Sequence, residues 1–282
     1  GRGARSFLPS MSGPQTWRLA AGVEYDGRAY RGWQAQRNAL GVQTVLERAL
    51  SRVADAPISV VCAGRTDAQV HGLGQVVHFD SPVYRPEHGW MLGANVHLPD
   101  DVAVTWVRPV PGEFHARFSA TGRRYRYLIL NRPARPGLLS GRVAWHPLPL
   151  DLEAMRAAAR LLLGRHDFSA FRANDCQAKT AVRELRELAL ARYGGFIVID
   201  VAADAFLKHM VRNIAGVLLR IGAGDAVPAW AAEVLAGRTR ADGGPTAAPG
   251  GLYLVAVSYP PAFGLPEQPL PALPPFVPAT PA

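Results

Sequence analysis

Cysteine is scarce in this chain, since its 282 residues include only Cys62 and Cys176. Two cysteines predict neither a disulfide framework nor a metal cluster, and they favour a reducing, cytoplasmic setting. The longest apolar runs are too short to cross a bilayer. The first residues show no charged start followed by an apolar stretch and a small-residue cleavage site. We therefore expect a cytoplasmic protein without a membrane segment.

Several catalytic signatures are missing as well. The sequence has no Gly-x-x-x-x-Gly-Lys phosphate loop, no Gly-x-Gly-x-x-Gly run after a predicted strand and no Gly-x-Ser-x-Gly elbow. A Cys-x-x-Cys pair and a His-Glu-x-x-His helix are absent too, which weighs against zinc chemistry. The eight histidines are scattered. Even His71 and His78 are expected to be structural or surface groups, so we predict no metal site.

Acidic residues are outnumbered: 31 lysines and arginines face 22 aspartates and glutamates, which gives a net charge of +9. This excess favours an anionic partner, with nucleic acid the first choice and an anionic membrane surface the second. No amphipathic basic helix supports the membrane alternative. Genomic base composition explains an Arg-rich and Ala-rich chain equally well.

The two ends of the chain differ from its middle. Residues 1–16 mix Gly, Ser, Pro and Arg without periodicity and are predicted to be a disordered extension. The tail 260–282 is dense in proline, so we expect an extended arm and neither a helix nor an inner strand. Between them we predict two α+β sets, 17–115 and 116–259.

Hydrophobic periodicity places the elements of these two sets. Strands are predicted at 19–25, 58–62, 75–79, 102–107, 124–130, 185–191, 196–201 and 252–257. Helices are predicted at 42–53, at 152–162 after an Asp151 cap and at 211–219. Gly194-Gly195 marks a hairpin. Two comparable sets predict two similar lobes, each a sheet with helices on one face, and a site in the cleft between them.

The run Gly64-Arg65-Thr66-Asp67 follows one predicted strand and precedes another. A loop held by a rigid sheet is a common place for chemistry. There Asp67 can face a substrate while Arg65 reaches a phosphate. The same residues also suit an aspartate that closes a turn beside a surface arginine.

Basic and aromatic residues alternate in two nearby runs, 114–118 and 123–127. Arginines contact phosphates and aromatic faces stack on unpaired bases, so the pattern is typical of an RNA surface. On a strand, Tyr125 and Tyr127 share one face, with the neighbouring arginines on the other. An ordinary strand with core tyrosines and solvated arginines explains the pattern equally well.

Arg212 lies in an otherwise apolar helix. Its neighbours must pack inward, so we expect a carboxylate partner that this arginine keeps ionised and aimed. A surface arginine that extends its charged end into solvent is the alternative.

Together these segments closely resemble the tRNA pseudouridine synthase A family, from about residue 17 to residue 260. The resemblance also includes several shorter motifs spread along the chain. They are Glu24-Tyr25-Asp26-Gly27, Gly32-Trp33-Gln34, Phe114-His115-Ala116-Arg117-Phe118-Ser119-Ala120 and Gly251-Leu252-Tyr253-Leu254-Val255-Ala256-Val257. Several separated motifs in the same order make the resemblance specific.

The resemblance implies an isomerase that converts uridine to pseudouridine at positions 38, 39 and 40 of the tRNA anticodon arm. It implies an α+β fold with two RNA-recognition-like, ferredoxin-type lobes around a continuous, mostly antiparallel sheet and a central catalytic cleft. A homodimer that needs neither cofactor nor metal is also implied.

The resemblance also assigns roles to individual residues. Asp67 matches the catalytic aspartate, Arg65 the arginine that enters the RNA, Tyr125 the tyrosine that packs on the target base, and Arg212 the basic partner of the aspartate. Two segments match those that touch RNA. They are Phe114, His115, Ala116, Arg117 and Phe118, and Asp175, Cys176, Gln177, Ala178 and Lys179.

One position departs from the family pattern, which has glycine two residues after the aspartate where this chain has Gln69. If the position needs a positive φ, a side chain there costs about 1–2 kcal/mol. We expect Gln69 to be tolerated and the enzyme to be active. A catalytically silent RNA-binding protein is the competing hypothesis, and whether Asp67 attacks the sugar or the base stays open.

Overall fold

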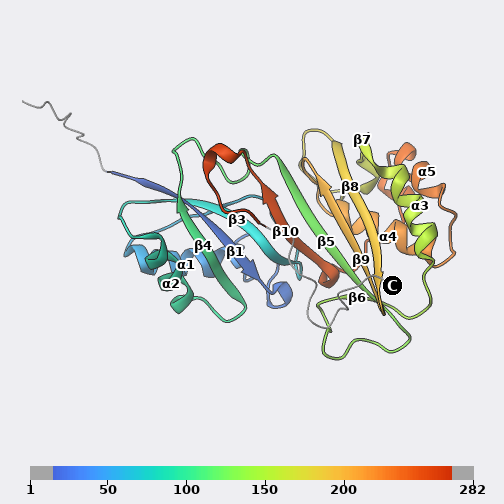
Figure 1. The fold of residues 1–282 in the computed structure, drawn as a ribbon, viewed down its shortest axis with the longest axis horizontal. Helices are drawn as coiled ribbons and strands as arrows, with labels where there is room; N and C mark the ends of the chain where they lie inside the picture. Colours follow the sequence, from blue (N-terminus) through green and yellow to red (C-terminus); the bar gives the residue numbers. More distant parts are fainter. Residues whose placement is uncertain (1–14, 269–282) are drawn as a thin grey trace, which may run out of the picture.

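The computed structural model describes residues 15–268 and is built on one ten-stranded sheet (Figure 1). The strands are β1 Trp17–Tyr25, β2 Val61–Cys62, β3 His71–Ser81, β4 Val102–Pro109, β5 Gly122–Asn131, β6 Ala144–His146, β7 Gly164–Asp167, β8 Val182–Tyr193, β9 Phe196–Ala203 and β10 Leu252–Ser258. The α-helices are α1 Val42–Ala54, α2 Glu87–His97, α3 Leu152–Leu162, α4 Met210–Gly222 and α5 Trp230–Gly237.

The sheet consists of two halves with the same topology. Its strand order is β4-β1-β3-β10-β5-β9-β8-β7, with β2 paired to β3 and β6 paired to β5. The first half runs β4-β1-β3-β2 and the second β10-β5-β9-β8, so each is a ferredoxin-type unit with its last strand beside its first. The predicted pair of RNA-recognition-like units is therefore confirmed.

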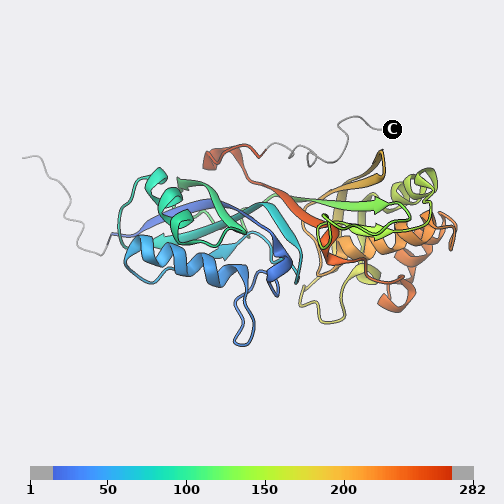
Figure 2. The same ribbon diagram turned by 90° about the horizontal axis from the view of Figure 1, so that it is seen from below.

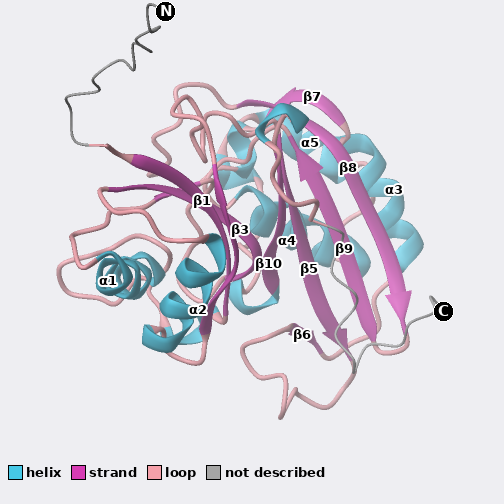
Figure 3. Ribbon diagram, turned by 60° about the vertical axis from the view of Figure 1, so that its left-hand side comes forward, coloured by secondary structure: helices cyan, strands magenta, loops and turns pink. Residues whose placement is uncertain are grey.

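The halves join where β10 lies between β3 and β5. Most pairings are antiparallel, and the β3–β10 contact is a short parallel one that matches His71 with Tyr253 and Gly72 with Leu254. The joined strands twist progressively across the molecule (Figure 3).

In the first half, α1 packs on the sheet through an apolar stripe. Leu46 and Leu50 are fully buried in one core with Val23 of β1, and α2 adds the buried Trp90. The spacing of the apolar residues in α1 matches the helical period, as predicted from the sequence.

In the second half, α3 and α4 cover the sheet. The Asp151 side chain caps α3 by accepting a hydrogen bond from the Ala154 amide at 3.0 Å, as predicted. Met155 of α3 and Ile214 of α4 are buried in one core with Tyr127 of β5.

The helices of both halves share one face of the sheet. Tyr25 pairs with Gly72, Gly72 with Leu254, and Leu254 with Tyr125, so these four positions point the same way. Figure 2 shows α1 and α4 on the same side of the strands. The predicted α+β fold, with a continuous, mostly antiparallel sheet and helices on one face, is confirmed.

Some predicted elements differ from the structure. The strand expected at 58–62 is reduced to β2, because the Ile58 and Val60 amides bond to side chains of α1 instead of to a strand. Ile58 donates to Ser51 Oγ at 2.8 Å and Val60 to Glu47 Oε1 at 2.9 Å. Helices α2 and α5 were not predicted.

The predicted extension 1–16 and tail 260–282 lie largely outside the described residues. Within the described part of the tail, Pro261–Phe263 forms a 3₁₀ turn, and Phe263 packs edge-on against Phe114 with ring centroids 5.1 Å apart.

The lobe boundaries 17–115 and 116–259 stay a prediction. The largest apolar core contains residues of both halves, since Ala20 and Val76 of the first half lie in it with residues of the second half.

Candidate active site

The loop between β2 and β3 is held on both sides, which fixes Asp67 near its apex. The Gly64 carbonyl accepts from Gln75 Nε2 at 2.6 Å, and the Thr66 carbonyl accepts from the Trp33 amide at 3.0 Å. The buried Thr66 hydroxyl shares a hydrogen bond of 2.7 Å with the Tyr25 hydroxyl. The loop is therefore a rigid support for the carboxylate that follows Thr66.

The Asp67 carboxylate meets two basic residues of the α4 N-terminal region. Its Oδ2 lies 3.2 Å from Arg212 Nη1 and 3.3 Å from His209 Nε2. Arg212 is itself oriented, because its Nε donates to the Ala247 carbonyl at 2.8 Å. The carboxylate partner predicted for Arg212 is thus confirmed, and it is Asp67.

The two oxygens of Asp67 have different surroundings. Both basic residues contact Oδ2, whereas Oδ1 accepts no hydrogen bond from the described residues. The Asp67 side chain is 23% exposed. A carboxylate anchored through one oxygen can present the other to a substrate.

His209 was not predicted as a site residue. It precedes α4 in the left-handed conformation, with φ of 63°, which few non-glycine residues adopt. Burial lowers the pKa of His209, the Asp67 charge opposes that shift, and the Arg212 charge adds to it. No local pattern in the sequence marks His209, because its contact with Asp67 depends on the placement of α4.

Tyr125 is brought to the same site from β5. Its side chain is buried, and its ring meets Phe206 edge-on with centroids 5.1 Å apart. Burial raises the pKa of Tyr125, and the nearby Asp67 charge raises it further, so the phenol stays neutral. It supplies an uncharged aromatic surface beside the carboxylate.

Arg65 is on the same loop but faces outward. It is exposed, and within residues 15–268 its guanidinium forms no hydrogen bond or ion pair with the chain. Its charge is therefore available to an anionic ligand close to Asp67.

The segment Phe114–Phe118 divides into buried and exposed residues. Phe114 and Ala116 are fully buried, so their side chains support the segment and do not meet a ligand. His115 and Phe118 stack with ring centroids 4.3 Å apart, and Arg117 lies over Phe118 at 5.5 Å. Phe118 is 75% exposed and Arg117 is also exposed, so an aromatic ring and a cation lie together at the surface.

The second predicted RNA segment lies beside α4. Its residues are Asp175, Cys176, Gln177, Ala178 and Lys179, three of them exposed and two half-buried. Asp175 forms an ion pair with Lys208, the residue before His209. The Ala173 amide also donates to the Lys208 carbonyl at 2.9 Å, which places this segment next to the site.

Two arginines that alternate with the tyrosines of β5 form ion pairs with acidic residues of the same sheet. Arg124 forms a bidentate pair with Glu187 at 2.8 and 2.6 Å, and Arg126 bonds to Asp200 at 2.9 and 3.2 Å. For these two arginines, ion pairs with acidic residues of β8 and β9 replace the phosphate contacts that the alternating pattern suggested.

Gln69 has a φ of 66°, so the position where the family pattern has glycine does adopt the left-handed conformation. The Gln69 amide donates to the Tyr30 carbonyl at 3.3 Å, and its side chain is exposed. The strain of about 1–2 kcal/mol is therefore present, two residues from Asp67.

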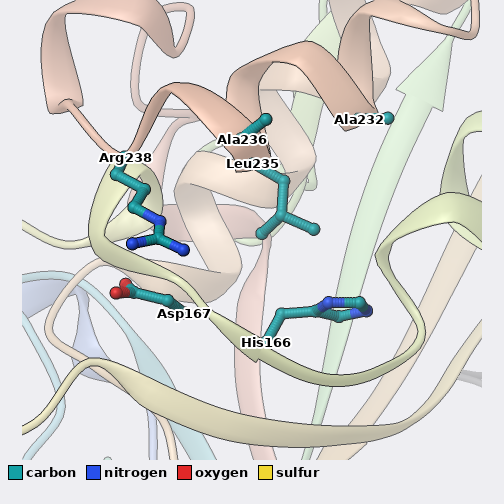
Figure 4. Close-up of a pocket in the computed structure, with 6 residues that line it drawn as sticks. All are labelled: His166, Asp167, Ala232, Leu235, Ala236 and Arg238. Carbon is teal, nitrogen blue, oxygen red and sulfur yellow. The ribbon is translucent and has the colours of Figure 1, made fainter.

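A hollow of about 500 Å³ lies at the far edge of the sheet, between β7 and α5 (Figure 4). Asp167 and Arg238 face each other across its rim, and none of the predicted site residues lines it.

Among residues 15–268, no cluster of three or more His, Cys, Asp or Glu suits a metal ion. No helix in that range is long and apolar enough to cross a membrane.

Comparison with known proteins agrees with this geometry. A family model described as tRNA pseudouridine synthase matches residues 21–119 and 158–260. The tRNA pseudouridine synthase A of Pseudomonas aeruginosa is 56% identical over 252 residues, which cover 89% of this chain and 88% of that protein. The protein of the same name from Nitrosococcus oceani is 55% identical over 250 residues, which cover 89% and 96%.

One solved structure, of an archaeal box H/ACA sRNP Nop10-Cbf5 complex, matches with 12% identity and a TM-score of 0.31 over 71% of this chain and 43% of that chain. That likeness is too distant to add to the assignment. The family match and the two close relatives are decisive, and they show that this chain belongs to the tRNA pseudouridine synthase family.

Proposed function

We propose that this protein isomerises uridine to pseudouridine at positions 38, 39 and 40 of the tRNA anticodon arm, with Asp67 as the catalytic residue and no cofactor. Membership of the tRNA pseudouridine synthase family supports the reaction and the class of substrate. The observation that carries the assignment of Asp67 is its contact with Arg212 and His209 through Oδ2 alone.

The chemistry requires one bond to be exchanged for another. The bond between N1 of uracil and C1′ of the ribose breaks, the base rotates, and C5 joins C1′ while its hydrogen leaves and N1 gains a proton. Charge develops near the ribose, so an ionised carboxylate held by two basic residues suits this step. In our proposal Oδ1 of Asp67 is the oxygen that faces the reacting atoms.

The target base must first leave the stack, which costs a few kcal/mol. We propose that the unpaired Arg65 enters the vacated space and offsets part of that cost. Tyr125 then packs on the extruded base, and its neutral ring excludes water while the uracil rotates. The exposed Arg117 and Phe118 hold the RNA outside the site.

The test uses a tRNA that carries tritium at C5 of uridine 39, because the reaction releases that hydrogen to water. The wild-type protein should release tritium and form pseudouridine. The Asp67→Ala variant should bind the same tRNA with nearly unchanged affinity and release none. Equal tritium release by this variant would reject Asp67 as the catalytic residue.

A catalytically silent tRNA-binding protein is the second candidate. The strained Gln69 beside Asp67 is the observation that favours it. Such a protein would bind tRNA and form no pseudouridine even at high concentration, so the same assay separates the two candidates.

We further propose a homodimer that acts on tRNA in the cytoplasm. The net charge of +9 supports the electrostatic part of RNA binding. Affinity for tRNA should fall steeply as salt rises, and light scattering should give twice the mass of 30.3 kDa. A flat salt response or a monomeric mass would contradict the corresponding part of the proposal.

A further inference from the structure

Arg123, the second residue of β5, has an unusual set of partners. Within the described part of the chain its guanidinium contacts no carboxylate, and it donates only to backbone carbonyls. Nη2 donates to the carbonyls of Ala63 at 2.9 Å and Arg117 at 2.8 Å, and Nη1 donates to the carbonyl of Asp204 at 3.2 Å. The charge of this half-buried guanidinium is thus stabilised by the dipoles of three peptide groups.

The three carbonyls belong to three different parts of the site. Ala63 opens the loop that carries Asp67, and Arg117 lies in the exposed segment next to Phe118. Asp204 follows β9 and starts the stretch that leads to His209. Ala63, Arg117 and Asp204 are 60, 6 and 81 residues from Arg123 in the sequence. The planar guanidinium of Arg123 bonds to the carbonyls of all three.

We propose that Arg123 is a positioning residue that fixes the RNA-contacting segment at Arg117 relative to the Asp67 loop and to the stretch that precedes α4. This inference rests on the proposed function. Arg123 acts through backbone groups and touches neither the base nor the ribose. RNA held at Arg117 and Phe118 is thereby aligned with the Asp67 carboxylate.

The shape of the guanidinium is essential to this role. Its planar fork holds several acceptors in fixed directions, whereas a lysine ammonium is a compact charge on a flexible stem. An Arg123→Lys variant keeps the charge but cannot hold all three carbonyls in place. A misplacement of about 1 Å at a reacting centre can cost about 100-fold in rate.

The first experiment measures turnover and binding of tRNA by Arg123→Lys. We expect kcat to fall about 100-fold, while Kd changes far less because no phosphate-contacting cation is removed. Arg192→Lys is the matched control, because Arg192 also bonds to a carbonyl, that of Leu150 at 3.0 Å, but in another part of the second half. The control should keep its kcat.

A second variant distinguishes loss of the positioning role of Arg123 from loss of folding. Arg123→Gly leaves a space for a free guanidinium ion, and millimolar guanidinium should restore part of kcat while ammonium of equal charge should not. Thermal unfolding shows whether each variant is folded at the assay temperature. If Arg123→Gly is unfolded, the lysine variant alone decides, and unchanged kcat in it overturns the proposal.

Hydrogen exchange provides a test that needs no activity. In Arg123→Lys, amide exchange should speed up together around residues 63–68, 114–119 and 204–209, and Arg192→Lys should affect none of them. Faster exchange in only one segment, or equal effects in the control, would overturn the proposal. If the wild type forms no pseudouridine, the proposed function fails, and the exchange pattern still decides whether Arg123 couples these segments.

Discussion

Among residues 15–268, an aspartate, an arginine and a histidine meet at two places. One group surrounds Asp67 in the loop that precedes β3, and the other surrounds Asp26 at the junction of the two halves of the sheet. The residue types are the same, so the difference between the groups lies in how the atoms are used.

Around Asp26, both carboxylate oxygens are occupied. Arg28 Nε lies 3.0 Å from Oδ1 and from Oδ2, and Arg142 Nη2 donates to Oδ2 at 3.0 Å. His71 Nδ1 lies 3.4 Å from Oδ1. No carboxylate oxygen in this group is left to accept from a ligand.

His71 is equally saturated. Its Nδ1 accepts from the Gly27 amide at 3.0 Å, so in the neutral ring Nε2 carries the proton. Nε2 then donates to the carbonyls of Gly141 at 2.9 Å and Gly250 at 3.2 Å. This group joins both halves of the sheet and has no free donor or acceptor on its histidine.

The Asp67 group is built differently. Oδ1 is unoccupied by the described residues, and two non-glycine residues with positive φ, Gln69 and His209, flank the carboxylate. In the Asp26 group the residue with positive φ is Gly141, where the conformation costs little. Free hydrogen-bonding capacity and backbone strain occur together at the site, as expected where function takes precedence over stability.

Changing each aspartate to asparagine should separate the two groups most clearly. Asp67→Asn should lower kcat/KM about 1000-fold or more, because in the proposed mechanism the Asp67 charge stabilises the reacting ribose. Asp26→Asn should keep kcat within a few-fold and lower the free energy of unfolding by about 2 kcal/mol. Tritium release and urea unfolding on both variants check this, and a reversed pattern would remove the distinction.

Changing the arginines gives the next largest effect. Arg212→Met leaves the Asp67 carboxylate without its cation and should lower kcat about 100-fold. Arg142→Met removes a cation whose side chain is 37% exposed and should cost less than about 1 kcal/mol of stability. Single-turnover rates and unfolding midpoints measure the two outcomes, and similar losses of rate would contradict the comparison.

Lowering the pH should show whether the charge of Asp26 stabilises the fold. Burial opposes ionisation of Asp26, but hydrogen bonds from Arg28 outweigh it and lower the pKa from 3.8 to about 2. Because the folded-state pKa is the lower one, the carboxylate stabilises the fold above about pH 4, and this contribution is lost as pH falls from 3.8 towards 2.

The stabilisation at stake is about 2 kcal/mol. The difference in unfolding free energy between the wild type and Asp26→Asn should therefore shrink across that interval. A difference that stays constant from pH 5 to pH 2.5 would show that the Asp26 charge does not stabilise the fold.

The smallest effect is expected at Gln69. Gln69→Gly relieves a positive φ but frees the unfolded chain, so the net stabilisation should be about 1 kcal/mol, with kcat changed less than about twofold. Ala68→Gly is the control, because Ala68 has no positive φ and its replacement should destabilise by roughly 0.4–1 kcal/mol. Activity that appears only in the Gln69→Gly variant would show that Gln69 is not tolerated.

Much of the fold could be predicted from local patterns. The apolar stripe of α1, the Asp151 cap and the Gly194-Gly195 hairpin each depend on neighbours in the sequence, and the structure contains all three. Helix α2 could not be predicted in this way. It contains Gly89 and Gly93, and its core contact depends mainly on Trp90, so its apolar stripe is too weak to detect.

Asp67, Arg65 and Tyr125 were predicted from their motifs and the family resemblance, whereas the ion pair of Arg212 was predicted from a conflict between a residue and its surroundings. Arg212 in an apolar helix required a partner, and Asp67 is that partner 145 residues away. His209 caused no such conflict in the sequence, since its contact with Asp67 arises only from the placement of α4. The pairing of Arg124 with Glu187 depends on strand register in the same way.

The last strand of the sheet, β10, lies between the two halves and makes the short parallel contact with β3. Leu254 of β10 pairs with Gly72 of β3 on one side and with Tyr125 of β5 on the other, so β10 sets the register between the two halves. Because β10 follows the other described strands in the sequence, the two halves can pair in this register only after residues 252–258 have been synthesised.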